Sequence, residues 1–299
     1  MSRIQVESAD RVVEVVTNSK DLIKMLQEES IPRTIIPGME ITSGKSTDFT
    51  LNINVGNEEG IHMDSNTLHI NYPRGKRIPK YPFAYALFYA FNRAYQEADI
   101  YHLHGSAISK DGQGLLILGH EDYGKSRISL KLCLDYGFTL NGDETILVGP
   151  NLNVIEGGNL IQISRDKLKH YFPDKNIVPK EFNEERDKLV LDSKDLGIFG
   201  KPGSKISKII YGHVCPYTPR FVQLEEGDAK RRIFEAVSEN IRGHGYVLFD
   251  INNAYPSLDT EALSKKRVSF VNRFVNSGIS VYNARDNLEN ICGKIAGLC

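Results

Sequence analysis

The sequence is poor in cysteine and carries no disulfide or zinc pattern. Its four cysteines stand far apart in 299 residues except for the last two, and none forms a CxxC pair: Cys133, Cys215, Cys292 and Cys299. A zinc site or a disulfide scaffold needs closely spaced ligands or paired cysteines. We therefore expect reduced thiols and a cytoplasmic protein.

Long apolar runs and an excess of one charge are also missing. No apolar stretch approaches the roughly 20 residues of a membrane span, and charged residues interrupt the N-terminal segment, where a secretory signal needs an apolar run. Lysine and arginine number 37 against 38 aspartate and glutamate, a net charge of −1. Nucleic-acid and membrane-surface binders need a basic field. We expect neither nucleic acid nor membrane among the partners.

What is present is the composition of a globular protein, with 40% hydrophobic and 25% charged residues. The local patterns predict a small α+β N-terminal domain over residues 1–98 and an α/β domain over 99–299, in which a mixed sheet carries the functional loop. An aromatic helix at 83–99 is interpreted as packing rather than as a stacking platform. Strands are predicted at 12–16, 49–55, 66–72, 115–119 and 245–251.

One motif carries the chemistry. Residues 119–126 read Gly-His-Glu-Asp-Tyr-Gly-Lys-Ser, which matches the phosphate loop G-x-x-x-x-G-K-[ST]. An apolar strand precedes the motif and a helix ending at Gly137 follows it, as such a loop requires. Backbone N–H groups then converge on phosphates at the positive end of the helix. Lys125 would neutralise β- and γ-phosphate charge, and Ser126 would place its hydroxyl on Mg²⁺.

The loop is unusual in its acidic residues. Glu121 and Asp122 stand where many phosphate loops carry small residues, and they would repel phosphate if they pointed at it. We expect both to face solvent, and Asp122 to tolerate left-handed backbone. The residues predicted to bind nucleotide are Gly119, His120, Glu121, Asp122, Tyr123, Gly124, Lys125, Ser126 and Arg127.

The stretch from Leu103 to Val148 resembles the core of HPr kinase/phosphorylase and its relatives, a group akin to phosphoenolpyruvate carboxykinases. The resemblance rests on a His-Gly strand, a glycine hairpin leading into the phosphate loop, a helix ending in glycine and an acidic strand-turn. It implies a P-loop-bearing mixed sheet of that type, with ATP and Mg²⁺ as cofactors. It also implies roles for His104 near the phosphates and for Asp143 as general base or metal ligand. Hexameric members of the group favour a homo-oligomer.

This chain departs from the two adjacent aspartates of the family. It reads Asn-Gly-Asp-Glu over residues 141–144. In one alignment Gly142 replaces the base and Asp143 keeps the metal. In the other, Asp143 and Glu144 are the acidic pair, shifted by one position. Asn-Gly-Asp is also strong turn chemistry, so a solvated turn is the competing interpretation. The later Glu and Arg-Gly signature of the bifunctional enzyme is not recognisable.

Several basic residues outside the motif are weaker candidates. Arg231, Arg232 and Arg242 would clamp phosphate, form subunit contacts or, as the sequence favours, lie on solvated helix faces. His213 and Cys215 have no further ligand type nearby in the sequence to complete a metal site. His244, between two glycines, fits a plain turn as well as a loop over a substrate.

The sequence therefore predicts an ATP- and Mg²⁺-dependent kinase that phosphorylates a hydroxyl of a small molecule or of a serine in a peptide or protein. Asp143, Glu144, His104 and Lys125 would be catalytic, and Ser126 and Asp143 would hold the metal. Two alternatives stay open. One is a nucleotide-binding sensor or scaffold without phosphotransfer, and the other is a carboxykinase-like enzyme with further metal-ligating residues.

Overall fold

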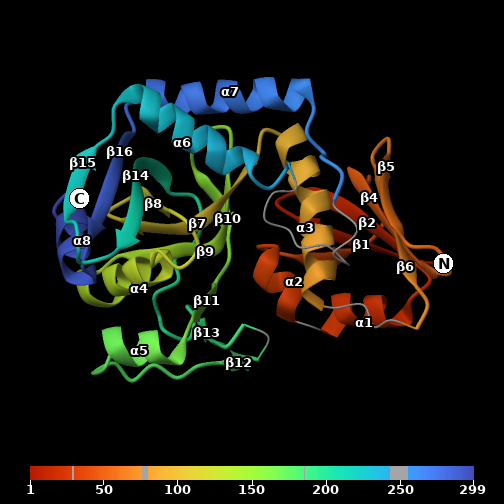
Figure 1. The fold of residues 1–299 in the computed structure, drawn as a ribbon, viewed down its shortest axis with the longest axis horizontal. Coiled ribbons are helices and arrows are strands. Elements are labelled where there is room, and N and C mark those ends of the chain that lie inside the picture. The colour runs from red at the N-terminus through yellow and green to blue at the C-terminus, as the bar shows by residue number, and fades with distance from the viewer. Residues whose placement is uncertain (29, 76–79, 185, 243–254) are drawn as a thin grey trace. The chain divides into compact units, whose positions relative to one another are not determined.

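The computed structural model describes residues 1–28, 30–75, 80–184, 186–242 and 255–299 (Figure 1). It divides into two compact units of mixed α/β structure. Unit 1 comprises Met1–His102 and Phe234–Phe270, and unit 2 comprises Leu103–Ile233 and Val271–Cys299. The sequence predicts a contiguous division after residue 98, whereas both units are discontinuous. The strand predicted at 245–251 lies outside the described residues, as does His244.

Unit 1 contains a six-stranded sheet in the order β3-β1-β2-β4-β6-β5, with parallel pairing of β2 with β4 and of β4 with β6. Side chains alternate between buried and partly exposed along β4 and β6, as expected for strands with one face on a core. The elements are β1 (Ser2–Ser8), β2 (Arg11–Thr17), α1 (Lys20–Glu28), α2 (Ser30–Ile35), β3 (Glu40–Thr42), β4 (Phe49–Gly56), β5 (Gly60–Asp64), β6 (Thr67–Pro73) and α3 (Lys80–Glu97).

Helix α3 packs against β2 and β4 and is the aromatic helix predicted from the sequence. Phe83, Phe91 and Tyr95 are fully buried, which confirms that its aromatic residues serve packing. Two further helices supply residues to both units: α6 (Glu226–Ser238) and α7 (Glu261–Asn276).

A buried arginine explains why residues 234–270 belong to unit 1. The Arg267 side chain is 0% exposed. Its guanidinium donates to Gln96 Oε1 at 2.7 Å, to Asp259 Oδ2 at 2.6 Å and to Ser238 Oγ at 3.1 Å. The Tyr89 hydroxyl of α3 also donates to the carbonyl of Pro256. These long-range partners have no local sequence signature, so the sequence pattern predicts that the segment belongs to the second domain.

Unit 2 is built on a seven-stranded mixed sheet in the order β10-β9-β7-β8-β14-β16-β15. Strand β14 runs parallel to both β8 and β16, so the carboxyl ends of these three strands meet at one edge. The elements are β7 (Tyr101–Lys110), β8 (Gln113–Leu118), α4 (Lys125–Tyr136), β9 (Thr139–Val148), β10 (Val154–Gly157), β11 (Leu160–Ile163), α5 (Arg165–Tyr171), β12 (Glu181–Asn183), β13 (Lys188–Asp192), β14 (Lys205–Val214), β15 (Arg220–Gln223), β16 (Ser280–Asp286) and α8 (Leu288–Ala296).

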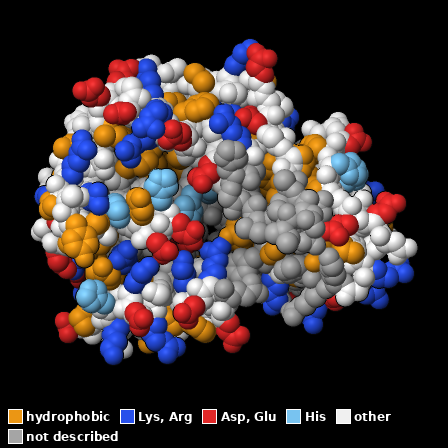
Figure 2. Space-filling view, in the orientation of Figure 1, with side chains coloured by type: hydrophobic (Ala, Val, Ile, Leu, Met, Phe, Trp, Pro, Cys, Tyr) orange, Lys and Arg blue, Asp and Glu red, His pale blue; other side chains and the backbone are white. Residues whose placement is uncertain are grey.

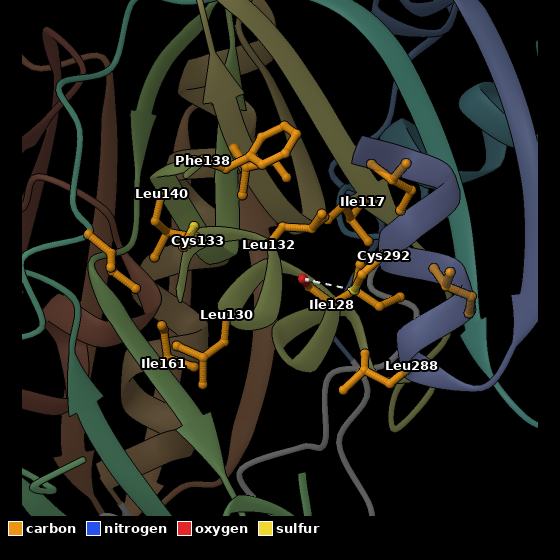
Figure 3. Packing of buried hydrophobic residues seen from close by; sticks show 14 of the residues in the cluster. Ile117, Ile128, Leu130, Leu132, Cys133, Phe138, Leu140, Ile161, Leu288 and Cys292 are labelled. Carbon is orange, nitrogen blue, oxygen red and sulfur yellow. Dashed lines mark hydrogen bonds between the residues drawn. The ribbon is translucent and has the colours of Figure 1, made fainter. Parts of the chain in front are cut away.

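The core of unit 2 surrounds α4 (Figure 3). Ile128 and Leu132 point toward Ile117 of β8 and toward the residues of α8, while Leu130 lies beside Ile161. The Cys292 thiol of α8 donates to the Ile128 carbonyl at 3.8 Å. Gly137 ends α4 with a φ of 73°, the left-handed cap predicted from the sequence. Packing against β8 and α8 on one side and β11 on the other therefore holds α4, the helix that follows the phosphate motif, in place.

The surface mixes charges of both signs. Figure 2 shows Lys and Arg side chains interspersed with Asp and Glu over the visible face. Within the described residues, no helix is both long and apolar enough to cross a membrane.

Candidate functional site

The motif residues form a turn between β8 and α4, at the carboxyl edge of the sheet. The backbone bends through left-handed conformations at Asp122 (φ 60°) and Gly124 (φ 95°), and Gly119 has a φ of 148°. A Cβ on Gly119 would lie 2.8 Å from the Gly212 carbonyl oxygen. A Cβ on Gly124 would lie 2.7 Å from a methyl group of Val214. Both glycines are therefore required by the close approach of the turn to the end of β14.

The two residues after the turn point toward its interior. The Lys125 ammonium donates to the His120 carbonyl at 2.9 Å, and its side chain is largely buried. Burial lowers the pKa of Lys125, while the nearby carboxylates of Glu144, Asp143 and Glu121 raise it. The Ser126 hydroxyl donates to Asp143 Oδ2 at 2.7 Å. The motif and the acidic strand β9 are thus joined by a direct hydrogen bond.

Asp143 is the most perturbed acid of the site. Its side chain is 1% exposed, and its other oxygen, Oδ1, accepts a short hydrogen bond from Ser106 of β7. The pKa of Asp143 is raised to about 7, first by burial and then by the neighbouring Glu144, against the opposing effect of the two serine hydroxyls and Lys125. A carboxyl group that titrates near neutrality suits general-base work, and a buried carboxylate beside a hydroxyl suits a metal ion.

The interpretation of residues 141–144 as a turn is wrong, because they lie within the continuous strand β9. The chain stays extended through a close approach of two glycines. A Cβ on Gly142 would lie 2.6 Å from the Gly157 Cα, and one on Gly157 would lie 2.4 Å from the Asn141 carbonyl oxygen. Position 142 therefore has no room for an aspartate with this backbone. Glu144, in the middle of the strand, has a φ of 64°. This left-handed conformation is strained for a residue other than glycine.

His104 lies beside the acidic strand. Its Nδ1 is 3.1 Å from the Glu144 carbonyl oxygen and 3.5 Å from Glu144 Oε2. The side chain is 38% exposed, so it is neither a core histidine nor a free surface one. The structure brings His104, Asp143 and Glu144 close together, with His104 touching the glutamate rather than the aspartate.

The acidic side chains of the turn face solvent. Glu121 and Asp122 are both exposed, and Asp122 Oδ1 accepts from the Lys167 ammonium of α5 at 2.9 Å. The pKa of Asp122 is lowered by that hydrogen bond first, and by the charges of Lys167, Lys188 and Arg127. Lysines from two later elements thus offset the unusual charge of the loop. Their positions in the sequence carry no signal of this role.

Aromatic contacts hold the outer side of the turn. The Tyr123 ring stacks on His213 of β14 at 3.8 Å between centroids, with 9° between the planes. The Val214 N–H donates to the Tyr123 carbonyl at 2.8 Å. Arg127 lies behind the turn, where it donates to the Asp122 carbonyl at 3.2 Å and stands 4.8 Å from the centre of the Tyr171 ring. Tyr123 and Arg127 therefore brace the loop.

Sequence reasoning missed Ser106, whereas Arg231 and Arg242 lie on exposed helix or loop surface, as the sequence favours. Ser106 is two residues beyond His104 in a strand, so the period of two puts both on one face; that spacing was an available signal. Arg231 pairs with Asp228 at 3.7 Å, and Arg242 with Asp259 at 3.3 Å. Neither of these ion pairs involves a residue of the phosphate motif.

No protein-family model matches the chain, and no curated protein matches it. Among solved structures, the chain is similar to the HPr(Ser) kinase/phosphatase from Coxiella burnetii at 14% identity, over 66% of this chain and 92% of that one, with a TM-score of 0.28. A TM-score this low supports no argument about fold or function.

Proposed function

We propose that the chain binds a nucleoside triphosphate with Mg²⁺ at residues 119–126 and transfers the terminal phosphoryl group to a hydroxyl. The observation that carries the proposal is the hydrogen bond between Ser126 and the buried Asp143. It joins the last residue of a phosphate motif to a carboxyl group whose pKa, raised by burial to about 7, suits proton transfer. A simple strand-to-helix turn has no need of such a pair.

The residues fit the nucleotide and the metal. The turn opens onto the N-terminus of the 12-residue helix α4, where unpaired N–H groups favour phosphate. Lys125 stands at the start of that helix and would meet the β- and γ-phosphates on leaving the His120 carbonyl. Within the described residues, no three His, Cys, Asp or Glu side chains gather as a metal site. Mg²⁺ needs only one or two protein ligands beside phosphate and water, and Ser126 and Asp143 would provide them.

The position of Asp143 is compatible with two candidate roles. As a metal ligand, its carboxylate would orient Mg²⁺ against the phosphates. As a base, it would accept the proton of the acceptor hydroxyl while the oxygen attacks phosphorus and the bond to the bridging oxygen of the nucleotide breaks. Glu144 is next in the strand, and its carboxylate lies 3.5 Å from His104 Nδ1. It is the second acid available for the role that Asp143 does not fill.

The alternative without chemistry, a nucleotide sensor, is favoured by the exposed carboxylates of Glu121 and Asp122 beside the loop. Transfer of labelled phosphate from ATP to a panel of hydroxyl metabolites and peptides separates the two functions when hydrolysis without acceptor is scored beside it. Binding of ATP without transfer or hydrolysis would support the sensor.

Lys125→Ala tests the loop itself, and Lys169→Ala, an exposed lysine of α5, is its control. We expect Lys125→Ala to remove transfer and to weaken ATP binding measured by calorimetry, because it deletes the cation that faces the phosphates. The control should match the parent protein. Equal ATP affinity in both variants and the parent would contradict the assignment of the loop.

A further inference from the structure

A row of basic residues crosses the carboxyl edge of the unit 2 sheet beside the phosphate motif. His213 of β14 pairs in register with Arg285 of β16, and Arg285 pairs in register with Arg220 of β15. Residues in register on neighbouring strands project from the same face of a sheet. Three side chains that can carry positive charge therefore lie side by side.

The row faces away from the core of α4. Its neighbours one position along, Gly212, Ala284 and Phe221, are also in register, and Ala284 and Phe221 pack in the core around α4 and α8. Because side chains alternate, the row projects from the opposite face. Tyr211 lies on that face too, with the Arg232 guanidinium 5.1 Å from its ring centre.

Among the described residues, no acid forms an ion pair with the two arginines of the row. Within the described part of the chain, neither Arg285 nor Arg220 forms an ion pair, and the Arg285 Nε is buried without a hydrogen-bond partner. The polar contact of Arg285 there is the Cys215 sulfur at 3.4 Å. The carboxylate of the adjacent Asp286 is engaged with Lys294 and Asn290 of α8. The pKa of His213 is lowered by burial and then by Arg285, Arg127 and His120, all of them basic.

The row begins at the nucleotide loop, because His213 stacks on Tyr123. We propose that His213, Arg285 and Arg220 bind an anionic group of the acceptor, a phosphate ester or a carboxylate, and hold its hydroxyl beside the phosphate loop. Arginine matches such groups with two parallel N–H donors, and Arg220 of the row is exposed while Arg285 is partly exposed. The proposal rests on the proposed function and adds the chemical class of the substrate.

The test uses inorganic phosphate and acetate as probes. The full chain is first saturated with Mg²⁺ and a non-hydrolysable ATP analogue, so that the phosphate loop is filled, and each probe is then titrated by calorimetry. We expect at least one probe to bind, and Arg285→Ala to weaken it at least tenfold without changing the affinity for the analogue. Phosphate binding favours a phosphorylated acceptor, and acetate binding favours a carboxylated one.

Three further variants separate a loss of anion binding from a loss of folding. Arg220 is exposed, so Arg220→Ala should fold and weaken the probe severalfold. Arg285→Lys keeps the positive charge but loses the two parallel N–H donors of the guanidinium. Its affinity for the probe should fall between those of the parent and Arg285→Ala. Arg231→Ala, which removes an exposed arginine of α6, should bind like the parent.

Three results would overturn the proposal. One is that neither probe binds the loaded protein, and another is that binding survives in both Arg285→Ala and Arg220→Ala. The third is that Arg285→Ala weakens the analogue instead, which would make the row part of the nucleotide site. If the parent does not bind the analogue at all, the proposed function fails, and the same variants in the nucleotide-free protein still decide whether the row binds anions.

Discussion

The turn of residues 119–124 and the strand β9 handle acidic side chains in opposite ways. Each places an acidic residue in left-handed backbone, Asp122 with a φ of 60° and Glu144 with a φ of 64°. In the turn, the carboxylates face water, and Lys167 pairs with one of them. In β9, Asp143 is buried against two hydroxyls. Burial, rather than the number of acids, therefore decides which carboxyl group has a raised pKa and suits catalysis.

The largest effect is expected from Asp143→Asn on phosphotransfer. The amide keeps the size of the side chain and one of its two accepting oxygens but removes the charge, so the rate should fall roughly 10²–10⁴-fold. A lost metal ligand would raise the Mg²⁺ requirement, whereas a lost base would lower turnover even at saturating Mg²⁺. Steady-state rates over a Mg²⁺ titration separate the two roles. Parent-like rates at limiting Mg²⁺ would transfer the role to Glu144.

Asp143 should also make stability depend on pH. Its pKa is raised by burial to about 7 in the folded protein, against about 3.9 in an unfolded chain. The folded state therefore holds a proton that the unfolded state loses, and the free energy of unfolding should fall as pH rises from about 4 to about 7. Asp143→Asn should remove this fall in the free energy of unfolding, because asparagine does not titrate.

Urea denaturation without nucleotide or metal tests the predicted direction of this change in the free energy of unfolding with pH. The stability of Asp143→Asn relative to the parent should grow between pH 5 and pH 8, by a few kcal/mol at most. Parallel curves for the two proteins over this range would show that Asp143 titrates normally.

The close approach of β9 and β10 predicts a smaller loss of stability. Gly142→Ala would press a methyl group onto Gly157, and we expect a cost of about 1–3 kcal/mol in the free energy of unfolding. Gly60→Ala is the control, because a Cβ there meets nothing within 4 Å. Equal stabilities of the two variants in urea would mean that β9 and β10 separate easily.

The smallest effect concerns the exposed acids of the turn. Replacing Glu121 by Ser and Asp122 by Gly should tighten ATP binding up to about fivefold at low salt, with the gain shrinking as salt screens the repulsion. The matched control replaces Glu58 and Glu59, an exposed acidic pair in unit 1, with Ser and Gly. An unchanged affinity at every ionic strength would show that these carboxylates do not act on the phosphates.

The sequence was informative where the determinants are local. The apolar run before Gly119, the spacing of the motif and the cap at Gly137 predict β8, the turn and α4, and the structure contains all three. The exposure of Glu121 and Asp122 is confirmed as well. The binding of nucleotide by the residues of the motif stays a prediction.

Prediction failed where distant residues decide. Asn-Gly-Asp chemistry favours a turn, but the fit of Gly142 against Gly157 and the hydrogen bond from the Asp143 N–H to the Gly158 carbonyl keep β9 extended. The partners of Asp143 include Ser106, which lies 37 residues away in the chain. The return of residues 234–270 to unit 1 likewise depends on contacts around Arg267 that no local pattern encodes.

The strand order of unit 2 has a consequence for synthesis on the ribosome. Among the described strands, β15 borders only β16 in the sheet, and β16 is made later than β15. Until residues 280–286 leave the exit tunnel, β15 lacks this neighbour, and the carboxyl edge beside the phosphate loop stays incomplete. Unit 1 likewise waits for residues 234–270. Unit 1 cannot finish folding before residue 270 is made, and unit 2 cannot before residue 286, so a chain cut short ahead of β16 should be cleared by proteases rather than accumulate.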